Sequence, residues 1–277
     1  MMNPRVALYC LLGGLPISVA ALGTGHFGWW WLSGILLAMS FVPVARFGPR
    51  GAIRQFGVIA PVLLIVTVLC TWSEAMVFVP GFSQHPLRDL AGSAVIYLVV
   101  AGVLAALAPA LKLTVASERA PERRPVATAA VMVFLCGLAY ALYYLVFGAI
   151  TYEFFTKAYY PDATQIAERL GLWLWAIQIG RGALMTLAVV PVIYTLRLRR
   201  WPTAVVTGLL VWVAGGLAPL AVPNEFMGTA QRMIHIVEIF TQNAALGVTA
   251  GLLLRPKARS STESATTTAP SGAAHIA

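Results

Sequence analysis

The stretch VATAAVMVFLCGLAYALYYLVFGAI, residues 126–150, contains no charged residue and no proline. At about 1.5 Å per residue, a helix of this length can cross the ~30 Å hydrocarbon core of a bilayer. Lipid offers no hydrogen-bonding partners, so a backbone inside it must satisfy its own polar groups. The apolar residues are continuous and do not alternate, which excludes a barrel strand. The sequence therefore predicts a transmembrane helix over this stretch.

Similar apolar runs recur along the chain, which is 59% hydrophobic and only 10% charged. Soluble domains carry about 25% charged residues. We therefore expect an all-α fold, a polytopic membrane helix bundle of about eight transmembrane helices, over residues 1–254. Residues 255–277 are rich in Ser, Thr and Ala, and we expect a disordered cytoplasmic tail there. The expected spans are Val6–Gly23, Phe27–Ala45, Val58–Val79, Ala94–Leu111, Val126–Ile150, Leu172–Leu196, Thr203–Val222 and Met233–Leu254.

The first apolar run also has features of a secretory signal peptide. Arg5 precedes it, and residues 18–20, Ser-Val-Ala, resemble a signal-peptidase site. However, the run contains two glycines and Pro16, and its basic region is minimal. We expect this segment to be retained as a membrane helix.

Basic residues are distributed unequally between the two sets of loops. Four lie on one side: Arg88, Lys157, Arg169 and Arg232. Fourteen lie on the other: Arg5, Arg46, Arg50, Arg54, Lys112, Arg119, Arg123, Arg124, Arg197, Arg199, Arg200, Arg255, Lys257 and Arg259. Short loops rich in Lys and Arg stay in the cytoplasm, so both ends of the chain are predicted to be cytoplasmic. The same distribution explains the net charge of +9 as a topology signal, and we expect no nucleic-acid partner.

The longest outer loop, residues 151–171, contains a helix-start signal. Asp162 is followed three residues later by Gln165, as in a capping box. A short helix at the outer surface is therefore expected over Ala163–Leu170.

Polar side chains inside a span are costly and are candidates for function. The last span carries most of them. Its residues Arg232, His235, Glu238 or Ile239, and Gln242 recur at helical spacing and are predicted to share one face, with Asn243 beside it. Such a stripe must face protein or water, because lipid cannot solvate it.

Gln178 and Arg181 lie three residues apart in the sixth span, where an arginine is too deep to reach the surface easily. Arg181 should therefore pair with a carboxylate, and Glu74 and Glu238 are the candidates. The expected site is a polar pocket that opens to the periplasmic side and is built from the third, fifth, sixth and eighth spans. Taken singly, Gln178, Gln242 and Asn243 could equally serve to hold helices together.

No motif for a nucleotide or cofactor is present: the sequence contains no P-loop, no HExxH and no GxSxG. We expect no cofactor. His235 and Glu238, with His26 or His85, could supply metal ligands, but a second His-x-x-Glu pair is missing, so no metal site is assigned.

Three stretches, FGAITYEFFTKAYYPD at 147–162, QIGRGALMTLAVVPVI at 178–193 and VPNEFMGTAQRMIHIVEIFTQNAALGV at 222–248, resemble a group of bacterial multi-span membrane proteins with no assigned activity. The likeness covers roughly the C-terminal half and transfers no catalytic residue. It implies a multi-pass protein of the bacterial inner (cytoplasmic) membrane.

Three functional hypotheses remain open. The first is a small-solute or ion-coupled permease that uses Glu74, Arg181 and Glu238, since a buried carboxylate whose proton competes with a cation is a common coupling device. The second is a non-catalytic accessory or scaffold subunit with a membrane-protein partner. The third is a membrane enzyme or metal-binding protein that uses His235 and Glu238. Besides the lipid bilayer, the expected partner is an unknown small solute or ion.

Overall fold

The computed structural model describes residues 3–79, 81–115, 123–159 and 163–256. Every regular element in these ranges is helical, and they contain no strand. The all-α prediction is therefore confirmed for the described residues. The predicted tail from residue 257 onward and the capping residue Asp162 lie outside them.

Several of the long helices are composite, because α-helical parts are joined end to end by π-helical segments (η). The elements in chain order are α1 (Pro4–Ala20), the 3-10 turn η1 (Leu22–Thr24), α2 (Phe27–Phe47), α3 (Ala52–Pro61), η2 (Val62–Cys70), α4 (Thr71–Phe78), α5 (Pro86–Ala110), α6 (Val126–Thr151), η3 (Tyr152–Thr156), α7 (Ala163–Leu170), α8 (Leu172–Thr195), α9 (Arg200–Trp212), η4 (Val213–Leu217), α10 (Ala218–Ala221), α11 (Thr229–Ile239), η5 (Phe240–Ala244) and α12 (Ala245–Leu254).

Seven of these helical rods are long and apolar enough to cross a membrane. They are Phe27–Phe47, Ala52–Val77, Pro86–Ala110, Val126–Thr156, Leu172–Thr195, Arg200–Ala221 and Thr229–Leu254. Each coincides with a predicted span, so the chain is compatible with an integral membrane protein that contacts the bilayer through many apolar helices. α1 forms where the first span was predicted but has only 17 residues, so the predicted count of eight is not confirmed.

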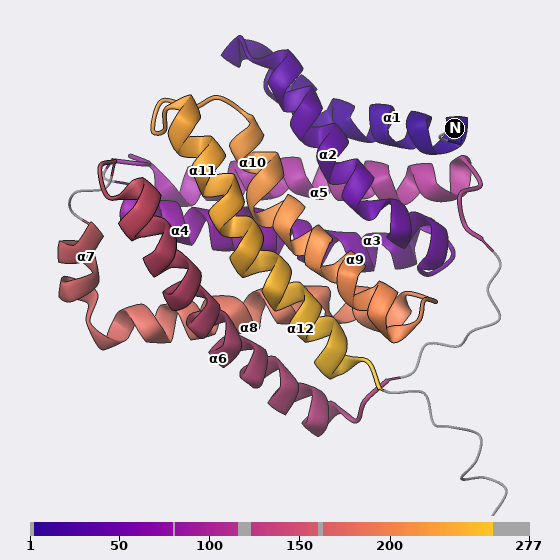
Figure 1. Ribbon diagram of the computed structural model, residues 1–277. Helices are drawn as coiled ribbons and strands as arrows, with labels where there is room; N and C mark the ends of the chain where they lie inside the picture. Colours follow the sequence, from indigo (N-terminus) through magenta and orange to yellow (C-terminus); the bar gives the residue numbers. More distant parts are fainter. Residues whose placement is uncertain (1–2, 80, 116–122, 160–162, 257–277) are drawn as a thin grey trace, which may run out of the picture.

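α7 forms where the short outer helix was predicted, over Ala163–Leu170. It stands at the left edge of Figure 1, beside the start of α8, whereas the N-terminus and the end of α12 lie toward the right. Gly171, between α7 and α8, has φ +50°, a backbone conformation that glycine adopts readily. The glycine thus allows the sharp change of direction from α7 into α8.

Small residues let the helices of the bundle approach closely. In α12, Gly247 and Gly251 face α9: a Cβ on Gly247 would stand 2.6 Å from the Cα of Gly208, and a Cβ on Gly251 would collide with Ala204. The GxxxG of the last span is therefore a packing motif, as expected for membrane helices. A second close contact joins α6 to α8, where a Cβ on Gly137 would stand 2.6 Å from the carbonyl oxygen of Ile179.

Arginine side chains bind the carbonyl groups at one end of the bundle. Arg255 donates to the carbonyl oxygens of Ile193 (2.6 Å) and Leu196 (2.7 Å), where α8 ends. Arg124 and Arg200 donate to carbonyl oxygens in the last turn of α12. The last carbonyls of a helix lack intrahelical partners, and cations are favourable there. These arginines therefore act as side-chain caps that tie helices together.

The α9–α12 contact gives a stability prediction. We expect Gly247→Ala to lower the free energy of unfolding by about 1–3 kcal/mol, because the added methyl group forces the two backbones apart. Gly102→Ala in α5 is the matched control, since a Cβ there meets no atom within 4 Å. Denaturant titration in mixed micelles measures both. Equal stability of Gly247→Ala and Gly102→Ala would show that the α9–α12 contact is looser than described.

Candidate functional site

The centre of the site is an ion pair between two helices. Nη2 of Arg181, in α8, lies 2.5 Å from Oε2 of Glu74, in α4. The exposed fractions are 6% for the arginine and 18% for the carboxylate. The sequence analysis gave Glu74 and Glu238 as candidate partners of Arg181, and in the structure the partner is Glu74. Its position follows from η2, which continues α3 into α4 and carries the chain to Glu74 without a break.

An aromatic ring from α6 covers the arginine. Cζ of Arg181 stands 5.7 Å from the ring centroid of Tyr140, within the range of a cation–π interaction. This approach depends on the absence of a side chain at Gly182, where a Cβ would collide with Cβ of Tyr140. The glycine beside Arg181 therefore brings the tyrosine over the charge.

A second charged pair comes from the last span. Nδ1 of His235 lies 2.9 Å from Oε2 of Glu238, one turn apart on α11. Gln242 donates from Nε2 to the other carboxylate oxygen of Glu238 at 3.4 Å. Both members of the pair are largely buried, at 19% and 15% exposed. His235, Glu238 and Gln242, which the sequence analysis placed at helical spacing, thus form a chain of hydrogen bonds along one face of the helix.

The two pairs belong to one electrostatic cluster. Glu74 interacts electrostatically with His235 as well as with Arg181. Tyr144 lies one turn from Tyr140 on α6, and the two tyrosine rings lie 6.5 Å apart. The third and sixth predicted spans thus meet at the ion pair under Tyr140 of the fifth, and Glu238 and Gln242 of the eighth lie beside Gly148 of the fifth.

The predicted polar stripe of the last span divides into two faces. His235, Glu238 and Gln242 face the cluster, and Gly148 of α6 lies beside the last two. Arg232 and Asn243 instead share the buried face with Ile239, which packs against Gly216 in η4. Arg232 thus lies on the side of Ile239, which the predicted stripe included as the alternative to Glu238.

Several polar atoms in and around the cluster are buried without a hydrogen-bond partner among the described residues. They are Oε1 of Gln178, Nε and Nη1 of Arg181, the hydroxyl of Tyr140, and both amide atoms of Asn243. Most buried polar atoms in proteins are paired, so this concentration marks an unusual part of the bundle.

Three π-helical segments pass near these residues. η2 precedes Glu74, η5 contains Gln242 and Asn243, and η4 contains Gly215, where a Cβ would lie 2.8 Å from Nδ2 of Asn243. π-helical turns inside α-helices are rare and often occur at functional sites. In η4 the sequence gives a reason, because Pro219 cannot donate the bond that the Gly215 carbonyl would accept in an α-helix. The other π segments could not be predicted from the sequence.

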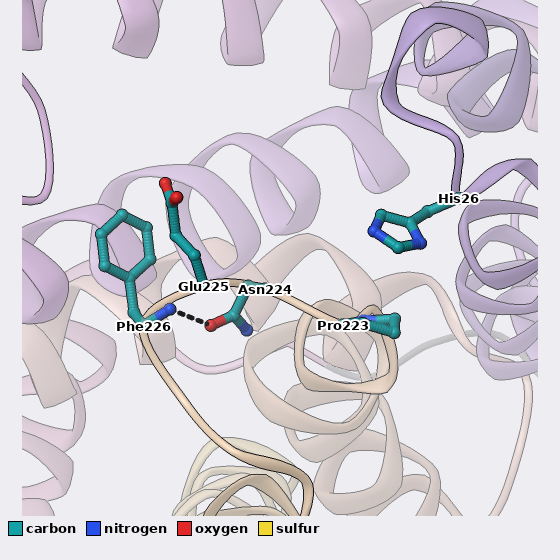
Figure 2. A pocket seen from close by; sticks show the side chains of 5 residues that line it. All are labelled: His26, Pro223, Asn224, Glu225 and Phe226. Carbon is teal, nitrogen blue, oxygen red and sulfur yellow. Dashed lines mark hydrogen bonds between the residues drawn. The ribbon is translucent and has the colours of Figure 1, made fainter.

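The cavity that the described residues form beside the cluster is smaller than a solute. This cavity, lined by Glu74, Gln178 and Arg181 among others, has a volume of about 10 Å³, roughly enough for one water molecule. A larger hollow of about 480 Å³ lies elsewhere, between the α1–α2 turn and the loop before α11. Figure 2 shows its lining residues, His26, Pro223, Asn224, Glu225 and Phe226. None of the residues selected from the sequence as a binding site lines this hollow.

No described group of three or more His, Cys, Asp or Glu residues is placed to hold a metal ion. His26 and His85, the third ligands considered from the sequence, therefore do not complete a site with His235 and Glu238 in the described part of the chain.

Sequence reasoning selected the charged members of the cluster but missed Tyr140. The available signal was its spacing of four residues from Tyr144, which places both rings on one face of α6. Comparisons with protein-family models, with curated proteins and with solved structures found no match. The site is therefore interpreted from its own geometry.

The Arg181–Glu74 pair predicts that removing the charge of Glu74 destabilises the protein far more than removing the charge of an exposed glutamate. Glu74→Gln leaves a buried guanidinium without its counter-charge and should lower the free energy of unfolding by about 3–5 kcal/mol. Glu153→Gln, which breaks the exposed pair with Lys157, should lower it by less than about 1 kcal/mol. Denaturant titration of the two variants checks this. A Glu74→Gln effect as small as that of Glu153→Gln would contradict the burial of the pair.

Proposed function

We propose that this protein is an ion-coupled permease of the bacterial inner membrane, in which the buried cluster takes up a proton from the periplasmic side. In this proposal α1 is an eighth span and both ends of the chain are cytoplasmic. The positive-inside distribution of Lys and Arg supports this orientation.

The observation that carries the proposal is the joint burial of two carboxylates, one arginine and one histidine. Arg181 balances Glu74, which leaves the carboxylate of Glu238 with His235. In a medium of low dielectric constant an unbalanced charge is strongly disfavoured. The cluster is therefore neutral only when the His235–Glu238 pair holds one proton, and that proton belongs to the pair rather than to either residue alone.

The size of the site supports a proton or a small cation as the species bound in this closed arrangement. A cavity of about 10 Å³ cannot hold a solute. Movement of a solute past the cluster would require α4, α8 and α11 to separate. Loss of the proton would leave the cluster with a net negative charge, and separation of the helices would expose that charge to water. Gln178, Gln242 and Asn243 would then supply polar contacts, which they lack or make only weakly when the bundle is closed.

The closely packed interior also favours one alternative, a non-catalytic accessory subunit whose ion pairs hold the helices together. Buried polar contacts in membrane bundles often have this role. An enzyme with His235 and Glu238 as acid and base has less support, because the cluster has no room for a substrate.

Proton-coupled transport can be tested before the solute is identified. The full chain is reconstituted in vesicles that contain a pH-sensitive dye, and solutes are added in classes: anions, cations, amino acids and sugars. We expect one class to change the internal pH in the wild type, and Glu238→Gln to abolish the change because it removes the carboxylate that exchanges the proton.

Glu168→Gln, which alters an exposed glutamate on α7, is the matched control and should behave as the wild type. His235→Gln should weaken the pH change, because it removes one of the two residues that share the proton. A wild-type protein that moves no proton with any class, while Glu238→Gln only lowers its stability, would favour the accessory role.

A further inference from the structure

A cation that the proton site does not use lies at the start of the last span. Arg232 is only 5% exposed, and its Nε and Nη1 atoms are buried without a hydrogen-bond partner. It forms no ion pair within the described part of the chain. The nearest glutamate along its helix, Glu238, is already bound by His235 and Gln242.

The helix that carries Arg232 adds further unsatisfied donors. α11 begins after Gly228, which has no side chain to cap the helix, and the first turn contains no acidic residue. The first N–H groups of a helix have no intrahelical acceptors, and the helix dipole makes this end partially positive. Arg232 donates its backbone N–H to the carbonyl of Gly228, so it stands within the first turn.

The side chain is placed to reach this helix end. Helical side chains lean toward the N-terminus of their helix, so the guanidinium of Arg232 is carried toward the uncapped turn. Its low exposure shows that packing holds the group in place and keeps it out of water. A buried cation without a partner and uncapped amides thus belong to the same end of α11.

We propose that Arg232 and the N-terminal amides of α11 bind an oxyanion, a phosphate or carboxylate group, at the outer face of the protein. An arginine fork and free helix amides both match two oxygens of such a group. The bound anion neutralises a guanidinium that is otherwise buried without a counter-charge. This site does not depend on the proton cluster or on transport.

The anion has two possible sources, a free solute and the phosphate of a lipid headgroup, and the test separates them. The full chain is purified in an alkyl maltoside, which contains no phosphate, and its thermal unfolding is followed while inorganic phosphate is added. We expect a saturable rise in the unfolding temperature of the wild type. Arg88→Gln, which alters an exposed outer arginine, should show the same rise.

Arg232→Gln should lose the response to phosphate. Arg232→Lys keeps the charge but lacks the fork, so phosphate should bind roughly tenfold more weakly. This second variant keeps the test valid if Arg232→Gln does not fold. A response to phosphate that is the same in the wild type, Arg232→Gln and Arg232→Lys would overturn the proposal.

The source is identified in lipid nanodiscs. In discs of a phosphate-free galactolipid, the response that depends on Arg232 should persist. In phosphatidylglycerol discs, loss of this response would identify the lipid headgroup as the occupant, because the lipid already fills the site. A response retained in both lipids would identify a free anion.

Discussion

A charged side chain in hydrocarbon must be neutralised by another part of the same protein, and the Arg181–Glu74 pair meets this requirement. The pair joins α8 to α4, and Tyr140 from α6 covers the guanidinium. Because a buried charge without a partner is strongly destabilising, three helices are held in one relative position by a single contact.

The second pair differs from the first in one essential respect. Arginine keeps its proton under all physiological conditions, so Arg181 and Glu74 form a permanent pair. Histidine can gain or lose a proton near neutral pH, so the pair of His235 with Glu238 can exist in two charge states. One part of the cluster thus fixes the structure, while the other can respond to its surroundings. This division of roles links the packing of the bundle to the proposed uptake of a proton.

The fold was largely predictable because apolar length and loop charge are properties of contiguous sequence. Seven rods and α7 appear where expected, and Arg181 of the sixth predicted span pairs with a carboxylate of the third. The choice of Glu74 over Glu238 as partner of Arg181 was not predictable, because it depends on how helices distant in sequence rotate against each other. The π segments had the same effect, because η2 and η5 interrupt the 3.6-residue repeat before Glu74 and at Gln242 and Asn243. The near absence of a cavity depends on side-chain packing, which periodicity does not describe.

The arginine caps at the other end of the bundle connect the order of synthesis to the final assembly. Arg255 follows α12 in the chain, yet it binds carbonyl groups at the end of α8, which leaves the ribosome much earlier. Until residue 255 emerges, α8 therefore lacks the donors that complete its last turn. The contact between the end of α8 and the residue after α12 can therefore form only once the last helix has been synthesised, so this part of the tertiary structure is completed late.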